Sequence, residues 1–216
     1  MGKNTDIREA TEAELDFDPL VDATNITVMN MNGEVALHGT VPSYPQYLEA
    51  AAAAQRIDGV KNVHNHLEVV LPPDDYRDDA LLTTAANNAL TLNITVPDGI
   101  EATADDGNLT LTGTAANGAQ RIAAEQAVAG LTGVRDVRDH IEIGYDADPV
   151  DVDVLVQDAL DRWVLIADDS DVSVDVSGNT VTLRGHVRTW AEHDAVVDAA
   201  WMASGVCDVR DVLTVG

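Results

Sequence analysis

The segment MNGEVALHGTV, residues 31–41, indicates the fold because two later segments of the chain repeat its pattern. These segments are DDGNLTLTGTA at residues 105–115 and SGNTVTLRGHV at residues 177–187, and the three align without gaps. In each copy, the late glycine of this segment is followed 20 residues further on by a second glycine and a valine. Self-similarity at a long, fixed period indicates tandem structural repeats. The chain of 216 residues is therefore predicted to contain three copies of one small module.

The quoted segments predict a β-hairpin in each copy. Apolar residues alternate along both arms, as Val35 and Leu37 do in the first copy, which is typical of half-buried strands. The two residues between the arms favour the positive φ angles of a type I′ turn. These turn dipeptides are Asn32-Gly33, Asp106-Gly107 and Gly178-Asn179. Gly39, late in the returning arm, is expected to end that strand where backbone or a helix comes close.

Two helices complete each module. The first precedes the hairpin and is predicted over residues 78–90 and 150–163 in the second and third copies, from apolar residues at helical spacing. The second follows the hairpin and is rich in alanine, the best helix former. It is predicted over residues 47–57, 120–131 and 190–203. The glycine that follows it is expected at the C′ position in the left-handed conformation.

A third strand closes each module, so the predicted order of elements is α-β-β-α-β. The second helix and the third strand form a crossover, which predicts that the third strand lies parallel to the second. Helices with one apolar stripe and strands with one apolar face pack most economically in two layers. The predicted fold class is α+β, with three tandem modules that each have a three-stranded mixed sheet and two helices on one face. Short proline-bearing linkers divide the chain into modules at residues 1–72, 73–146 and 147–216.

The chain is strongly acidic, with 38 Asp and Glu against 12 Lys and Arg and a formal net charge of −26. Apolar periodicity persists throughout the chain, which argues against disorder. In molar salt the Debye length falls to about 3 Å, so surface carboxylates barely repel one another. The composition therefore favours a protein adapted to high salt, with an ordinary acidic protein as the alternative. This charge argues against nucleic acid as a partner and disfavours anionic membranes.

The compartment is predicted from what the sequence lacks. Cys207 is the only cysteine, so no disulfide can form within the chain. The N-terminal residues lack the apolar region of a signal peptide. No stretch approaches the roughly 18 consecutive apolar residues of a membrane span. We therefore expect a cytoplasmic protein.

The module resembles the BON domain. One part of the resemblance is the glycine-centred hairpin, at residues 32–41, 106–115 and 178–187. The other part is a closing G-V-x-x-V segment with its third strand, at residues 59–69, 133–143 and 205–215. The resemblance implies binding of phospholipid membranes or other surfaces, because the family is associated with osmotic-shock proteins of the bacterial envelope, secretin-like rings and mechanosensitive channels. It also implies a potassium-sensing alternative, because one relative resembles a cytoplasmic potassium sensor.

Three histidines form the candidate metal site. His64 and His66 are two residues apart on the predicted third strand, and His38 lies on the neighbouring strand. All three have the parity opposite to the core residues, so they could converge on the open face of the sheet and bind a transition metal. Three solvated histidines on an exposed face are the alternative.

Three apolar residues are candidates for an interface. Met29 and Met31 have outward parity on the first strand, and an exposed methionine pair can mark an adaptable contact surface. Packing against the next module is the alternative for this pair. Trp201 lies off the predicted apolar stripe of its helix, which indicates a contact between modules or between subunits.

One local basic cluster stands out in the acidic chain. Arg184, His186 and Arg188 lie beside Trp190 and could hold an anion or a lipid headgroup, with the tryptophan at the interface. Local balancing of the acidic charge is the alternative.

No motif for catalysis is present: the sequence has no nucleophile elbow, P-loop, dinucleotide fingerprint, HExxH or CxxC. The three copies share turn and core residues but no reactive side chain, so we predict a protein that is not an enzyme and has no cofactor. Asn65, Asp139 and Asp211 recur at one position of the third strand, where an Asx side chain can bond local backbone.

These observations predict a non-catalytic binding and assembly protein that associates with itself or with another protein. A link to osmotic or envelope stress is expected from the resemblance. Peripheral binding to phospholipid membranes and a response to potassium ions are the two alternatives.

Overall fold

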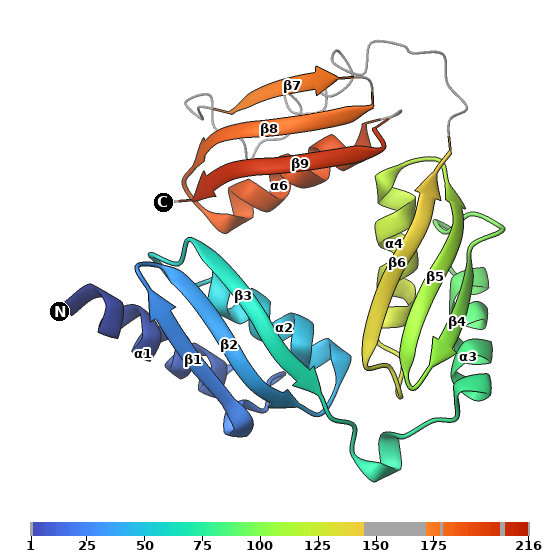
Figure 1. Cartoon of the computed structure of the whole chain (residues 1–216), viewed down its shortest axis with the longest axis horizontal. Helices are drawn as coiled ribbons and strands as arrows, with labels where there is room; N and C mark the ends of the chain where they lie inside the picture. Colours follow the sequence, from blue (N-terminus) through green and yellow to red (C-terminus); the bar gives the residue numbers. More distant parts are fainter. Residues whose placement is uncertain (1, 145–171, 178, 204–205, 216) are drawn as a thin grey trace. The chain divides into compact units, whose positions relative to one another are not determined.

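The computed structural model describes residues 2–144, 172–177, 179–203 and 206–215, which are drawn in colour in Figure 1. The described residues form three sheets of three strands each, accompanied by helices. The predicted α+β class and the three repeated modules are therefore confirmed. The helix predicted over residues 150–163 lies outside the described residues.

The described elements follow the predicted order in each module. Module 1 contains α1 (Gly2–Phe17), β1 (Ile26–Met31), β2 (Glu34–Val41), α2 (Tyr44–Gln55) and β3 (Asn62–Val69), with a short 3-10 turn, η1 (Ala23–Asn25), before β1. Module 2 follows η2 (Pro73–Asp75) and contains α3 (Asp79–Leu92), β4 (Glu101–Asp105), β5 (Asn108–Ala115), α4 (Gly118–Ala129) and β6 (Asp136–Ile143). Module 3 contains β7 (Ser173–Ser177), β8 (Thr180–Val187), α6 (Trp190–Met202) and β9 (Asp208–Val215). None of the described helices is long and apolar enough to cross a membrane.

Each sheet has the second strand of its hairpin in the middle. In module 1, β1 pairs antiparallel with β2, and β2 pairs parallel with β3. In module 3, β7, β8 and β9 repeat this arrangement. The prediction that the third strand lies parallel to the second is confirmed in both modules.

The predicted hairpin turns are present in the first two modules. Asn32 and Gly33 have φ angles of 60° and 94°, and Asp106 and Gly107 have φ angles of 48° and 76°. Two successive residues with positive φ are the mark of a type I′ turn, whose twist matches that of the flanking strands. Gly178, in the third turn, lies outside the described residues.

Gly39 lies inside β2, so the prediction that it ends the strand is wrong. The strand continues to Val41 and pairs with β3 along its whole length. The expected close approach is present, because a Cβ atom at Gly39 would collide with the carbonyl oxygen of Asn25, and the φ angle is 127°. The glycine therefore lets the backbone that enters β1 lie directly against the middle strand.

The helix after the hairpin begins and ends earlier than predicted in module 1. α2 starts at Tyr44 rather than at residue 47, with Pro45 in its first turn, where the fixed φ of proline suits a helix. It ends at Gln55, two residues before the predicted end. Gly59 has a left-handed φ of 87° but lies four residues beyond Gln55. The expectation that this glycine occupies C′ is therefore wrong.

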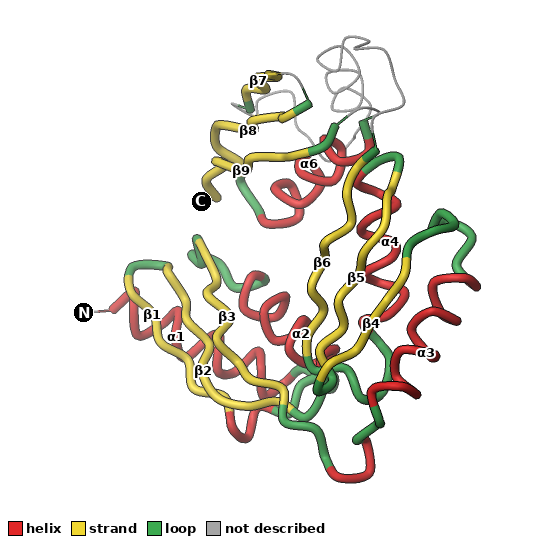
Figure 2. Tube along the Cα trace, turned by 45° about the vertical axis from the view of Figure 1, so that its right-hand side comes forward, coloured by secondary structure: helices red, strands yellow, loops and turns green. Residues whose placement is uncertain are grey.

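The middle strand of module 1 buries alternate residues. On β2, Val35, Leu37 and Val41 are buried, while Glu34 is exposed. Figures 1 and 2 show α1 and α2 on one side of this sheet, and the alanines of α2 that face it are fully buried. Within module 1 the opposite side of the sheet carries no described helix. One face of the sheet is therefore core, and the other face is free to contact solvent or a partner.

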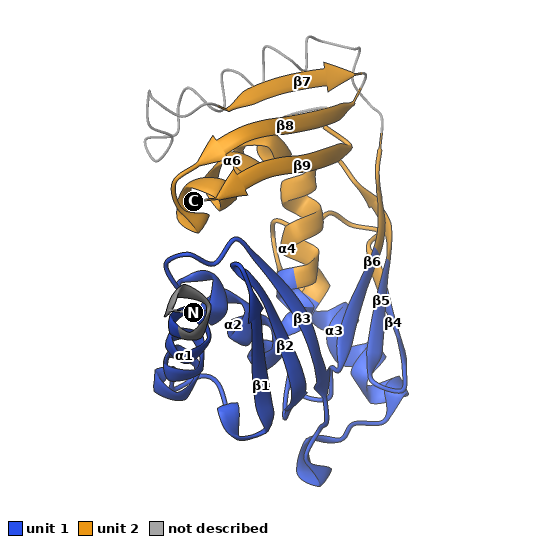
Figure 3. Cartoon of the chain, turned by 60° about the vertical axis from the view of Figure 1, so that its left-hand side comes forward, with its two compact units in different colours: residues 1–89, 102–111, 126–139 blue, residues 90–101, 112–125, 140–216 orange. Residues whose placement is uncertain are grey.

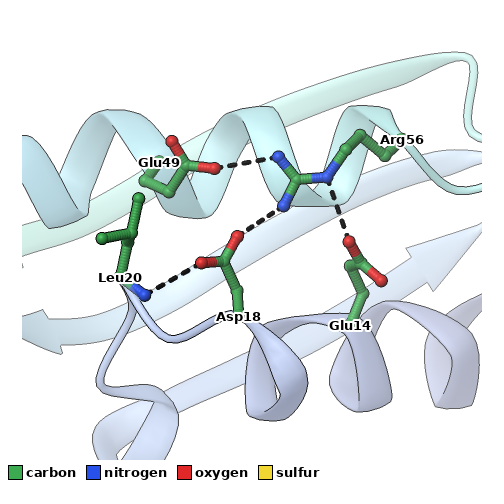
Figure 4. A network of polar contacts seen from close by, with 5 residues as sticks. All are labelled: Glu14, Asp18, Leu20, Glu49 and Arg56. Atoms are coloured by element: carbon green, nitrogen blue, oxygen red, sulfur yellow. Dashed lines mark hydrogen bonds and ion pairs between the residues drawn. The ribbon is translucent and has the colours of Figure 1, made fainter.

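Arg56 joins the two helices of module 1 (Figure 4). Its guanidinium donates hydrogen bonds to Glu49 at 2.9 Å, to Glu14 at 3.0 Å and to Asp18. The Asp18 carboxylate also accepts a bond from the backbone N–H of Leu20 at 2.9 Å. The Leu20 bond and the contact with Arg56 together lower the pKa of Asp18. This network of one cation and three carboxylates fixes α1 against α2.

The chain divides into two compact units, coloured separately in Figure 3. One unit contains residues 1–89, 102–111 and 126–139, and the other contains residues 90–101, 112–125 and 140–216. All elements of module 1 lie in the first unit, and all described elements of module 3 lie in the second. Module 2 contributes to both units.

We expect Gly113→Ala to destabilise module 2 by about 3 kcal/mol or more, through backbone strain and steric overlap. Gly113 is the counterpart of Gly39: its φ is 132°, and an added Cβ would collide with the carbonyl oxygen of Gly99. Gly130→Ala is the matched control, because nothing lies within 4 Å of a Cβ atom at that position. Hydrogen exchange of module 2 peptides measures the stability of this module in the two variants. Equal protection of these peptides in both variants would contradict the predicted strain at Gly113.

Candidate functional site

The uncovered side of the first sheet is the main candidate for a binding surface. We call it the open face of module 1, and it consists of the strand residues with parity opposite to the buried set. Its members are Thr27, Met29, Met31, Glu34, Ala36, His38, Thr40, Asn62, His64, His66 and Glu68. It carries two acidic residues and no Lys or Arg, in a chain whose net charge is −26.

The two methionines predicted to face outward do so. The exposed fraction is 53% for Met29 and 74% for Met31. In the β1–β2 register, Met29 lies opposite Ala36, and Met31 lies opposite Glu34. Cross-strand neighbours on one face of a sheet are in contact distance of each other. Met29, Met31 and Ala36 therefore form a small apolar area at the β1 side of the open face.

The structure also brings the three candidate histidines together on this face. His38 lies directly opposite His66 across β2 and β3, with ring centroids 5.0 Å apart and ring planes at 20°. The rings of His64 and His66 are 6.3 Å apart at 9°, and Nε2 of His64 lies 3.0 Å from a carboxylate oxygen of Glu34. The rings stack, and no three potential ligands in the described residues are arranged to hold a metal ion. Metal binding by His38, His64 and His66 stays a prediction.

The corresponding positions in the other two modules are polar. The methionine positions hold Thr103 and Asp105 on β4, and Asp175 and Ser177 on β7. The position of Ala36 holds a threonine in both modules. Since all three modules have the same fold, the apolar area of module 1 is not needed for folding.

The structure divides the predicted basic cluster between two places. Arg184 and His186 are exposed on the open face of module 3, where Arg184 lies 3.6 Å from a carboxylate oxygen of Asp175. Arg188 and Trp190 lie beyond the end of β8, at the start of α6. Arg184 and His186 are therefore the members of the cluster that lie on the open face, and binding of an anion or a lipid headgroup by the four residues stays a prediction.

The start of α6 contains a capping arrangement that our sequence analysis missed. The Thr189 hydroxyl accepts a bond from the Glu192 backbone N–H at 3.1 Å, and the Glu192 carboxylate accepts one from the Arg188 N–H at 2.9 Å. In module 2, the Gln120 side chain accepts the equivalent bond from the Ala116 N–H at 2.9 Å. The Thr-x-x-Glu spacing is the sequence signal of such a cap. The helix start therefore explains one carboxylate oxygen of this buried glutamate, while its Oε1 atom is buried without a hydrogen-bond partner among the described residues.

The recurring Asx residue of the third strand bonds local backbone, as expected. Asn65 accepts a bond from the Leu67 N–H at 3.2 Å, and Asp211 accepts one from the Leu213 N–H at 2.9 Å. Asn65 also donates to the carbonyl oxygen of Tyr47 on α2 at 2.8 Å. This residue therefore ties the third strand to the helix that packs on it.

In module 3 the same position forms an ion pair that the sequence did not reveal. The Nε2 atom of His193 lies 2.7 Å from Asp211, and its Nδ1 atom lies 3.0 Å from Asp194. The Trp190 ring meets the imidazole edge-on, with centroids 4.8 Å apart. Bonding to Asp194 and the charge of Asp211 raise the pKa of His193, against the opposing effect of burial. The arrangement favours an imidazolium that links α6 to β9, and it offers no nucleophile for catalysis.

Trp201 packs against the core cluster of module 3. Within the second compact unit, the guanidinium carbon of Arg121 lies 4.3 Å from the centroid of the Trp201 ring, a cation–π contact. The indole is thus half-buried rather than freely exposed. A role for Trp201 in assembly stays a prediction.

The BON domain family model matches three times, over residues 3–70, 78–145 and 151–216. No curated protein sequence matches the chain. The C-terminal domain of CdsD, a structural protein of the type III secretion system of Chlamydia trachomatis, is 17% identical, and the alignment covers 97% of this chain and 96% of that one with a TM-score of 0.27. The periplasmic domain of the type III secretion inner membrane protein PrgH from S. typhimurium is 10% identical, with 92% and 96% covered and a TM-score of 0.24.

We expect the stability of module 3 to fall as the pH rises above 6.5. The pKa of His193 is raised in the folded state, so its contribution is complete below the unfolded pKa and is lost as the pH rises through the folded pKa. Tryptophan fluorescence during thermal unfolding reports module 3 and the contact of Trp201 with Arg121, because Trp163, Trp190 and Trp201 are the only tryptophans. The transition temperature should decrease by a few degrees across this range.

His193→Arg is the matched control, since arginine occupies the aligned position in module 2 and does not titrate in this range. This variant should lose the pH dependence and keep its stability at high pH. An unchanged pH dependence in His193→Arg would assign the effect to another group.

Proposed function

Because the chain belongs to the BON domain family, we propose that it is a non-catalytic binding and assembly protein whose copies associate through the open face of module 1. The family supplies the coarse part of this function, binding through small repeated domains. The finer part, the surface that binds, rests on the residues of this chain.

The observation that carries the proposal is the exposure of Met29 and Met31 on the same face of one strand. Neighbouring large apolar side chains on the surface of a soluble domain mark an interaction site. Methionine suits such a site because its unbranched, polarizable side chain adapts to the partner. Their burial against a second copy would remove apolar surface from water, which favours association.

Comparison of the modules supports a functional origin of this area. Strands β4 and β7 hold polar residues at both methionine positions, yet they pair in sheets of the same order. A fold requirement would apply equally to the three modules. The methionines therefore serve a purpose specific to module 1, and contact with a partner is the purpose that their exposure supports.

The net charge sets the conditions under which copies can meet. Two chains of charge −26 repel each other in dilute salt, where the Debye length is long. Molar salt shortens the Debye length to about 3 Å and removes most of this repulsion. We therefore propose that assembly operates in a high-salt interior, which agrees with the expected cytoplasmic setting.

A second candidate function is peripheral binding to lipid surfaces. The observation in its favour is a set of exposed apolar residues at the ends of the first helices and in the loops that follow them. They are Phe17 and Leu20 in module 1, and Leu92 and Ile94 in module 2. Leu20 and Ile94 occupy the same position of the repeat, with exposed fractions of 65% and 100%. The potassium-responsive alternative stays a prediction.

We expect the double variant Met29→Thr, Met31→Asp to be monomeric under conditions in which the unaltered chain assembles. Light scattering after size-exclusion chromatography in about 2–3 M KCl measures the mass, where charge repulsion is screened. The substitutions are the residues of module 2, so the fold tolerates them. The apparent association constant should fall by roughly tenfold or more, because two apolar side chains lose their burial.

Thr103→Ser with Asp105→Asn is the matched control, because it changes the same positions of the module 2 sheet. This control should assemble like the unaltered chain. A 22.9 kDa monomer for the unaltered chain at every salt concentration would refute self-association.

For the lipid candidate, we expect Leu20→Ser with Ile94→Ser to reduce flotation with phosphatidylcholine vesicles in 2 M KCl. Removing two insertable aliphatic side chains should weaken binding by roughly tenfold or more. Leu81→Ser is the control, since Leu81 is an equally exposed leucine on α3. Absence of the unaltered chain from the floated fraction at every lipid composition would exclude this function.

A further inference from the structure

We infer that the open face of module 3 receives the open face of module 1 from another copy, so that the chain assembles head to tail. This inference deepens the proposed assembly function and rests on it. It commits to a second copy of this chain as the partner, and it follows from the charges and apolar groups of the three open faces.

The open face of module 3 carries positive charge at its centre. Six residues occupy the central outward positions of β8 and β9: Thr182, Arg184, His186, Arg210, Val212 and Thr214. None of them is acidic, and two of them are among the 12 basic residues of the chain. In the β8–β9 register, Arg210 lies opposite Thr182, and Val212 lies opposite Arg184. The arginines are therefore diagonal neighbours with an apolar residue between them.

The two arginines are available to a partner. Arg184 lies 3.6 Å from Asp175, and Arg210 lies 3.7 Å from Asp208, and the exposed fractions of the two arginine side chains are 56% and 72%. Exposed pairs of this length contribute little to stability, so a partner can replace them at low cost. Val212, at 56% exposure, adds apolar surface between the arginines.

The open face of module 1 has the complementary character. It bears Glu34 and Glu68 without any Lys or Arg, and its histidine rings offer flat surfaces on which a guanidinium can stack. Its exposed methionines offer an apolar surface against which the exposed Val212 of module 3 can pack. Ion pairs enclosed in such an interface are screened by salt much less than exposed ones, so they persist in molar KCl.

The two other pairings that the open face of module 1 could make are unfavourable by charge. Two module 1 faces would bring two acidic surfaces together without a basic residue. The open face of module 2 has one arginine, Arg138, against four acidic residues: Glu101, Asp105, Asp136 and Glu142. Like charges placed opposite each other disfavour an interface. By the same count, the open face of module 3 has two arginines against two acidic residues, Asp175 and Asp208, so it is the least acidic partner for the module 1 face.

A contact between unlike faces has a definite consequence for the assembly. Such a heterologous contact leaves one free face at each end, so it produces either closed rings or open filaments. A symmetric contact between two module 1 faces would instead stop at a dimer. The order of the modules along the chain thus gives the assembly a direction.

The test uses two variants with one defective face each. The first is Met29→Thr, Met31→Asp, which alters module 1, and the second is Arg184→Glu, Arg210→Glu, which alters module 3. We expect each to be monomeric alone, with an association constant at least about tenfold weaker than that of the unaltered chain. An equimolar mixture should form a discrete dimer, because each variant retains the face that the other lacks. Light scattering after size-exclusion chromatography in 2 M KCl measures all three samples.

Each other outcome overturns a different statement. If the unaltered chain is monomeric, the proposed function fails, and this inference fails with it. If the unaltered chain assembles and the module 3 variant does so equally well, only the inference fails. If both variants are monomeric but their mixture forms no dimer, module 3 takes part in assembly without receiving module 1, and the inference fails again.

Two further samples keep the result interpretable. Arg138→Glu reverses the arginine on the open face of module 2 and should leave assembly unchanged. If Arg184→Glu, Arg210→Glu fails to show the tryptophan fluorescence of folded module 3, Arg184→Gln with Arg210→Gln replaces it. This second variant removes the positive charges without adding negative ones.

Discussion

Val35 and Leu37 are completely buried beneath the helices of module 1, and the residues that alternate with them therefore point the other way. This one-sided burial determines the arrangement of the whole module. It fixes which residues of each strand hold the core, because the side-chain period of a strand is two and a shift by one residue would reverse both faces. The outward-facing residues of each strand do not pack in the core, so they can differ between modules without loss of the fold.

The sequence predicted the parts of this fold that depend on local chemistry. The hairpins were predictable from dipeptides that accept positive φ, such as Asn32-Gly33, and the shared face of His38, His64 and His66 from strand parity alone. The exact start of α2 was not predictable, because its first turn contains Pro45, and the fixed φ of proline suits either a turn or a helix start. Gly39 was misplaced at a strand end because a close approach by backbone occurs equally well along a strand.

The parts of the candidate site that escaped prediction depend on tertiary contacts. Arg184 and Arg188 look like one cluster in the sequence, but the chain leaves the sheet after Val187 and carries Arg188 to the start of α6. His193 meets Asp211 only because α6 packs against β9. No periodicity or spacing encodes such a contact, which joins residues on different elements. The stacking of the histidine rings is likewise a property of the β2–β3 register.

The three copies of the module share one fold, so the residues that differ between them are the residues that the fold does not require. Residues present in all copies, such as the turn glycines and the buried strand residues, explain the fold and hide what the chain binds. The differences lie on the open faces: methionine and histidine in module 1, mixed charge in module 2, and arginine with valine in module 3. The chain has a net charge of −26, and acidic surface residues favour its solubility. Exposed arginines at the centre of one face do not serve solubility in this way, so they indicate a binding role. Unequal faces at the two ends of one chain are what a directional contact between copies requires.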